Sequence, residues 1–141
     1  MNTKKYVKVI EKALDELGFD VSEARDENFG ENDEYSWYVV NKDQMIVVFI
    51  DETSFDILCP VFNSNQIPDK IEFYKDLLKL ADDYKGITTS IDKDNSVMVT
   101  ESRVLEGLDK DEALEAIALV TNCSEEIFEK LKFKYDIPDE E

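Results

Sequence analysis

The stretch 35–63, YSWYVVNKDQMIVVFIDETSFDILCPVFN, decides the fold of this chain. It contains three runs that are rich in Val, Ile and aromatic residues, YSWYVVN, MIVVFID and FDILCPVFN. Runs of this composition, bounded by Asn, Asp, Lys or Ser, are typical of β-strands. The linkers near Lys42–Gln44 and Glu52–Ser54 are short enough to force hairpins. We therefore predict three consecutive antiparallel strands.

Alternation along these strands predicts a core face. If both turns have two-residue loops, alternate side chains of the three strands share a face. One face is then entirely apolar or aromatic, and at about 25 cal/mol per Å² its side chains are too costly to leave in water. The ten residues of this predicted core face are Tyr35, Trp37, Val39, Ile46, Val48, Ile50, Phe55, Ile57, Cys59 and Val61.

The opposite face of the three strands is mixed. It is too apolar for an ordinary solvated surface, so we expect either that a helix or loop covers it or that it docks a partner or a second subunit. On the second alternative, aromatic and aliphatic side chains would be the anchors, with two carboxylates beside them able to pair with basic groups of a partner. The candidate interface residues are Tyr38, Val47, Phe49, Leu58 and Phe62, bordered by Asp51 and Asp56.

The rest of the chain supplies helices and a second hairpin. Apolar residues at helical spacing predict helices over 3–17, from Pro68 to about residue 84, and from Asp109 to about residue 135. Alternation predicts a hairpin with strands 87–91 and 97–105. We expect residues 20–34 to form a solvated acidic loop, with room for a short strand near Val21.

These elements give the order α-β-β-β-α-β-β-α. The predicted fold class is α+β, an antiparallel sheet of about five strands with three helices. We expect residues 1–137 to form a single α+β domain and the acidic tail 138–141 to be disordered.

Charge and hydropathy limit the partners. The formal net charge is −18, from 34 acidic and 16 basic residues. This charge disfavours nucleic acid and anionic membranes as partners, whereas a basic polypeptide remains a compatible partner. The N-terminal segment has no uninterrupted apolar region, and the longest aliphatic run, 45–50, is too short to span a bilayer. We therefore expect a cytoplasmic protein whose two cysteines, Cys59 and Cys123, are buried reduced thiols.

The motifs of catalysis are absent. The chain has no histidine, which is the commonest general base and nitrogen ligand for zinc, and it lacks the glycine-rich nucleotide-binding and nucleophile-elbow motifs. The turn DKDNS at 92–96 begins like an EF-hand loop, but Val97 and Arg103 stand where glycine and glutamate are needed. We expect no cofactor, no metal and no enzymatic activity, with a small carboxylate-only enzyme as a remaining alternative.

Three segments resemble those of a known fold: the central helix KIEFYKDLLKLADDY, the hairpin GITTSIDKDNSVMVTESRVL and the helix opening LDKDEALEAIALV. With the element order, size and charge, they resemble the type III secretion chaperone-like fold, and within it the YbjN-like branch. The resemblance implies a non-enzymatic α+β module, commonly a homodimer. In the secretion chaperones, apolar patches hold an extended, partly unfolded segment of a client, and YbjN-like members are described as regulators.

Two functional hypotheses follow. The first is a chaperone-like adaptor or regulator that binds a partner polypeptide through the mixed sheet face and its flanking helices. The alternative is an acidic immunity or antitoxin-like protein that masks a basic partner. The broad apolar stripe over 68–84, added to the mixed sheet face, is more apolar surface than we expect one monomer to hide, so we predict a homodimer.

Overall fold

A computed structural model describes residues 3–137 of the chain. The helices are α1 (Val7–Glu16), α2 (Val21–Ala24), α3 (Lys70–Asp83) and α4 (Lys110–Tyr135), and short 3-10 turns cover Thr3–Tyr6, Glu31–Asp33 and Ser64–Gln66. The strands are β1 (Tyr35–Asn41), β2 (Gln44–Ile50), β3 (Ser54–Asn63), β4 (Thr88–Ile91) and β5 (Ser96–Val104). The predicted α+β class and element order are confirmed, with α2 as an additional short helix. The predicted acidic tail, 138–141, lies outside the described residues.

The five strands form one antiparallel sheet in the order β1-β2-β3-β5-β4. The β1–β2 turn has two residues, because Asn41 pairs with Gln44. The β2–β3 turn closes with a 3.1 Å hydrogen bond from the Asp51 amide to the Ser54 carbonyl, which again leaves two residues in the loop. These even loop lengths preserve the alternation that the sequence predicted, and all ten residues of the predicted core face are buried.

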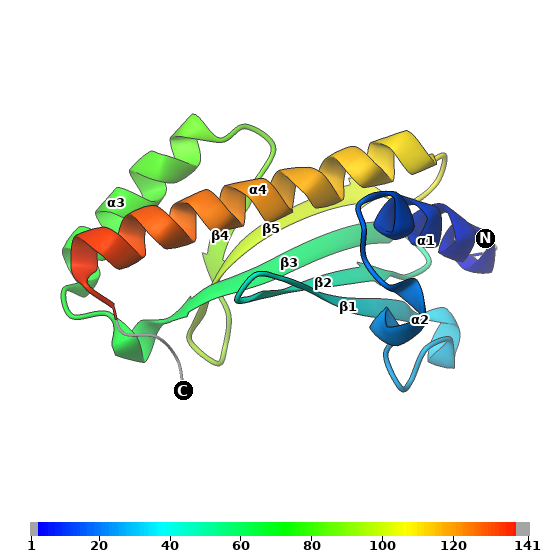
Figure 1. The fold of residues 1–141 in the computed structure, drawn as a ribbon, viewed down its shortest axis with the longest axis horizontal. Coiled ribbons are helices and arrows are strands. Elements are labelled where there is room, and N and C mark those ends of the chain that lie inside the picture. Colours follow the sequence, from blue (N-terminus) through cyan, green and yellow to red (C-terminus); the bar gives the residue numbers. More distant parts are fainter. Residues whose placement is uncertain (1–2, 138–141) are drawn as a thin grey trace.

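The helices α1 and α4 cover this core face, and α3 lies beside α4 over the β4 end of the sheet (Figure 1). At 1.5 Å per residue, the 26 residues of α4 extend about 39 Å along the sheet. The predicted cap is confirmed, because the Asp109 side chain accepts a 2.8 Å hydrogen bond from the Glu112 amide. Pro68 precedes α3 rather than starting it, and Asp69 caps that helix.

The predicted strand near Val21 is wrong. Val21–Ala24 forms a helical turn instead, because the Asp20 side chain caps it by accepting a 3.0 Å hydrogen bond from the Ser22 amide. A side-chain acceptor two residues before the amide satisfies a helix N-terminus and competes with extended backbone.

The strand-like contact in this region falls one turn later, at Arg25. Arg25 pairs with Trp37 at the outer edge of β1, and the Asp26 amide donates a 3.0 Å hydrogen bond to the Ser36 carbonyl. The Phe29 ring packs edge-on against Trp37 at 5.3 Å between ring centroids. Segment 20–34 is therefore anchored to β1 and is not only a solvated loop.

Cys59 and Cys123 are buried and not joined in a disulfide, as predicted. Among residues 3–137, no helix is long and apolar enough to cross a bilayer. Within the same residues, no three Cys, Asp or Glu side chains are grouped so as to hold a metal ion.

Candidate protein-binding surface

The sheet face opposite the core has no helix among α1, α3 and α4 packed on it (Figure 1). Its side chains are half-buried or exposed, and the Tyr38 side chain is 41% exposed. We call this surface the open face. Its members are Ser36, Tyr38 and Val40 from β1, Met45, Val47 and Phe49 from β2, Asp56, Leu58 and Pro60 from β3, and Met98, Thr100 and Ser102 from β5.

Strand register brings four of the predicted anchors together on the open face. Tyr38 pairs with Val47, and Val47 pairs with Leu58. Phe49 lies in the adjacent row, between Ser36 and Asp56. Neighbouring strands are about 4.8 Å apart, so these four side chains form one contiguous apolar patch. Their role in binding remains a prediction.

Phe62 does not belong to this patch, and its predicted position is wrong. The β3–β5 register shifts between Pro60 and Phe62, so that Phe62 pairs with Val97 on the core face. Phe62 is 5% exposed, and its ring stacks on Phe128 at 5.2 Å between centroids.

The cause is a β-bulge. Proline has no amide N–H to donate to the ladder, and strand prolines concentrate at edges and bulges. The residue inserted after Pro60, Val61, is buried as well as Phe62, so two consecutive side chains turn to the core. Pro60 inside an otherwise regular strand was the signal that could have revealed this shift.

The two bordering carboxylates are held in place by local hydrogen bonds. Asp51 accepts hydrogen bonds from the amides of Thr53 at 2.8 Å and Ser54 at 2.9 Å, and these bonds lower the pKa of the Asp51 carboxyl. Asp56 accepts hydrogen bonds from the Ser54 hydroxyl at 2.7 Å and from the Ser102 hydroxyl. The apolar patch therefore has a fixed negative border at the Phe49 end.

The sequence prediction missed the contribution of β5 to the open face. Met98 pairs with Pro60, and Thr100 pairs with Leu58. The alternation of β5 was visible in the sequence, but the strand order β3-β5-β4 was not. The open face is thus apolar over β1–β3 and carries hydroxyl groups toward β4.

A second apolar surface lies on α3. The buried line of α3 consists of Phe73 and Leu77. Ile71 and Leu78, which lie within the broad apolar stripe predicted over 68–84, are 72% and 64% exposed. The broad apolar arc of this helix therefore has an inner and an outer part, and its outer part is not covered by the described chain.

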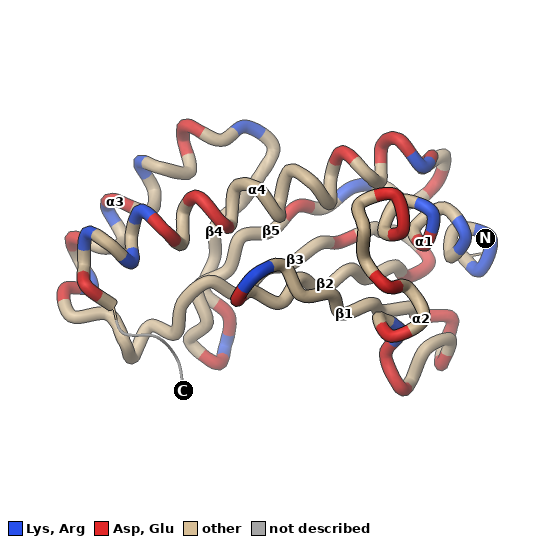
Figure 2. The backbone as a smooth tube through the Cα atoms, viewed as in Figure 1, with Lys and Arg blue, Asp and Glu red and all other residues tan. Residues whose placement is uncertain are grey.

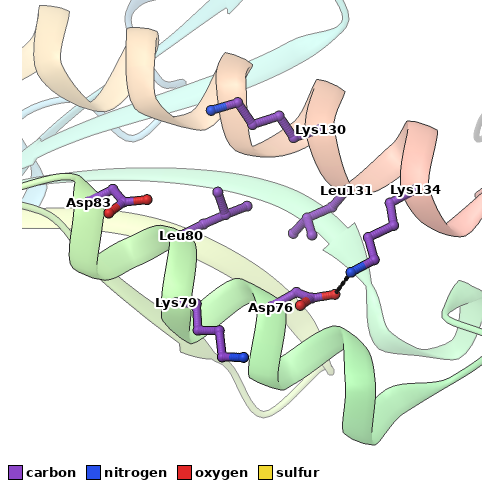
Figure 3. A pocket seen from close by; sticks show the side chains of 7 residues that line it. All are labelled: Asp76, Lys79, Leu80, Asp83, Lys130, Leu131 and Lys134. Atoms are coloured by element: carbon purple, nitrogen blue, oxygen red, sulfur yellow. Dashed lines mark hydrogen bonds and ion pairs between the residues drawn. The ribbon is translucent and has the colours of Figure 1, made fainter.

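A groove of about 260 Å³ runs between α3 and α4 (Figure 3). Leu80 and Leu131 form its apolar part, and a 2.6 Å ion pair between Asp76 and Lys134 crosses it. Partial burial and the hydrogen bond to Asp76 raise the pKa of Tyr135 to about 12. These pairs join the two helices.

Comparisons with known proteins support the fold. No family model matches the chain, and no curated protein matches it in sequence. A crystal structure of an uncharacterized protein from Methanothermobacter thermautotrophicus has 19% identity and a TM-score of 0.63, with 94% of this chain and 99% of that chain covered. A chain of the HopA1–SchA chaperone–effector complex has 12% identity and a TM-score of 0.57, with 88% and 93% covered.

A third similar structure is a complex from Yersinia pestis, of the type III secretion chaperone SycH with a stable fragment of YscM2. It has 13% identity and a TM-score of 0.56, and the match covers 86% of this chain and 98% of that one. Identities this low show the fold alone, and the YbjN-like branch remains a prediction. On this structural evidence, the chain has the type III secretion chaperone-like fold.

Proposed function

We propose that this protein is a non-enzymatic, chaperone-like adaptor or regulator that binds an extended apolar segment of a partner polypeptide on the open face. The observation that carries the proposal is the contiguous patch of Tyr38, Val47, Phe49 and Leu58, which none of the helices α1, α3 and α4 covers. The chaperones SchA and SycH, which have the same fold, were solved with an effector and with a fragment of another protein.

The size of the patch limits how tightly it can bind. Burial of a fully exposed large apolar side chain stabilises by about 1.5–3 kcal/mol. The four anchors are already partly buried in the monomer, so together they contribute less than roughly 6–12 kcal/mol before costs. Association itself costs an estimated 4–15 kcal/mol. The patch alone is therefore too small for stable binding, and the partner segment must extend over neighbouring surfaces or be held by two copies of the chain.

We further propose that the chain forms a homodimer through the outer part of α3. Ile71 and Leu78 are exposed there, and the adjacent strand β4 is an edge of the sheet. Sedimentation at high micromolar concentration tests this: the wild-type chain should sediment as a dimer and Leu78→Lys as a monomer. Phe133→Lys, which changes a more exposed apolar residue on α4, is the control and should remain dimeric. A monomeric wild-type chain would rule the dimer out.

The alternative, an immunity or antitoxin-like protein, is favoured by one observation. Glu23, Glu27, Glu31 and Glu34 in segment 20–34 are all exposed. A partner held by these carboxylates would lose affinity steeply with salt, because charge interactions are screened beyond about 10 Å at 0.1 M salt. Binding through the open face should instead persist at high salt.

The proposed function is tested by capture followed by titration. The protein is used as bait in a lysate of its native cell, and the captured partner is purified and titrated against wild-type, Tyr38→Lys and Phe133→Lys variants. We expect Tyr38→Lys to weaken binding by more than about tenfold, or about 1.4 kcal/mol, and Phe133→Lys to leave it unchanged. Equal affinity for all three variants would contradict the open face as the binding surface.

A further inference from the structure

The exposed side of α1 and of the turn before it carries lysines at successive helical turns. Lys4, Lys8 and Lys12 are four residues apart and exposed. We call them the lysine stripe. Figure 2 shows blue along this N-terminal helix, whereas red dominates the neighbouring segments. The stripe points away from the sheet, because Ile10 and Leu14 occupy the opposite side of α1 and are buried.

Among the described residues, no carboxylate forms an ion pair with the lysine stripe. Glu11 and Glu16, which lie within helical reach of it, are bound elsewhere: Glu11 by Arg25 at 2.6 Å, and Glu16 by Lys110 at 2.6 Å. Within residues 3–137, none of the three lysines has a hydrogen bond or ion pair. Asp15, one turn beyond Lys12, is exposed.

The stripe also opposes the local stability of the helix. Like charges four residues apart destabilise a helix by about 0.2–0.5 kcal/mol per pair. Cations near the N-terminus are disfavoured by the helix dipole, and α1 has no acidic residue in its first turn. The three unpaired lysines thus combine like-charge repulsion with an unfavourable dipole interaction, in a chain with 34 acidic and only 16 basic residues. Such departures are expected at functional surfaces.

We propose that the lysine stripe docks an acidic stretch of a partner polypeptide. Lysines four residues apart on a helix are about 6 Å apart along its axis, and the stripe is about 12 Å long. Alternate residues of an extended peptide are about 6.6 Å apart, so a short segment with a carboxylate at every second residue matches the stripe. A longer polyanion such as nucleic acid would pass beyond the stripe onto a protein of net charge −18 and be repelled.

The stripe and the open face lie on opposite sides of the molecule, so the two proposals stand on separate residues and can fail separately. The stripe is tested with a triple variant, Lys4→Gln, Lys8→Gln and Lys12→Gln. The matched control is Lys70→Gln, Lys85→Gln and Lys93→Gln, three exposed lysines without ion pairs. Both variants change the net charge by the same amount, so a difference in binding between them does not come from the net charge of the protein.

The probe is a fluorescently labelled peptide of three Glu-Ser repeats, whose three carboxylates span about the length of the stripe. It is titrated at about 25 mM salt, where surface charge interactions are weakly screened. We expect the stripe variant to bind at least about fivefold more weakly than wild type and the control to change by less than about twofold. Removing the repulsion should leave the melting temperature of the stripe variant equal or higher. A lower melting temperature would assign the lysines a structural role and overturn the proposal.

Other outcomes also overturn it. These are wild-type protein that does not bind the peptide, equal losses in the two triple variants, or loss of self-association in the stripe variant. Tighter stripe-dependent binding of single-stranded DNA or of phosphatidylserine vesicles than of the peptide would assign the stripe to a different partner.

Discussion

Replacing Phe62 by alanine should strongly destabilise the protein. The Phe62 ring is 5% exposed, stacks on Phe128 at 5.2 Å and meets Phe73 edge-on at 5.4 Å between centroids. Deleting a ring enclosed in this way costs about 3–5 kcal/mol, because the removed apolar surface and the remaining cavity both contribute. Typical domains have only about 5–15 kcal/mol of stability, so the Phe62→Ala variant should be marginally folded.

The assay is urea unfolding followed by circular dichroism. Phe133→Ala is the matched control, since Phe133 is 91% exposed and its loss should change the free energy of unfolding by less than about 0.5 kcal/mol. Phe62→Leu keeps most of the apolar volume and should cost less than about 1.5 kcal/mol, which keeps the test usable if the alanine variant unfolds. A loss below about 1 kcal/mol for Phe62→Ala would refute the bulge, because only a surface ring is removed so cheaply.

Two further predictions concern the anchoring of segment 20–34 and the β2–β3 turn. Glu11→Ala removes the partner of Arg25 and the acceptor of the 3.0 Å hydrogen bond from Trp37 Nε1, so it should lower the free energy of unfolding by about 1–3 kcal/mol, and Glu11→Gln should lower it less. Urea unfolding followed by the fluorescence of the single tryptophan measures both variants, and equal losses of stability would contradict the bond to Trp37. Hydrogen bonds from the Thr53 and Ser54 amides lower the pKa of Asp51 below its unfolded value of about 3.9. The ionised Asp51 carboxylate therefore stabilises the folded protein fully above about pH 3.9, and this stabilisation is lost as the pH falls through the lower pKa of the folded state. The difference in unfolding free energy between wild type and Asp51→Asn should therefore be largest near about pH 6 and shrink in acid, and a difference independent of pH would contradict this origin.

The core of this protein was predictable from its sequence because two short turns preserve alternation. Lys42 and Asp43 form a two-residue loop, so Val39 and Ile46 share a face, and the same parity continues through the second turn. The capped start of α4 was equally visible, since Asp109 and Glu112 stand at capping-box spacing.

What the sequence could not reveal depends on contacts between distant residues. The α3 pattern offers two adjacent apolar lines, and only packing against α4 selects Phe73 and Leu77 as the inner one. The pairing of Arg25 with Trp37 rests on an ion pair to Glu11, fourteen residues earlier. The location of the open face was half predictable: its β1–β3 part follows from alternation, but its β5 part follows from strand order.

The central claim is that the open face is a binding surface and not a second core. The direct measurement uses one variant, Phe49→Lys, and records both its unfolding free energy and its affinity for the captured partner. We predict a folded protein that loses less than about 1.5 kcal/mol of stability, because Phe49 is half-buried on an uncovered face, and that binds more than about tenfold more weakly. An unfolded variant, or a folded one with unchanged affinity, would contradict the claim.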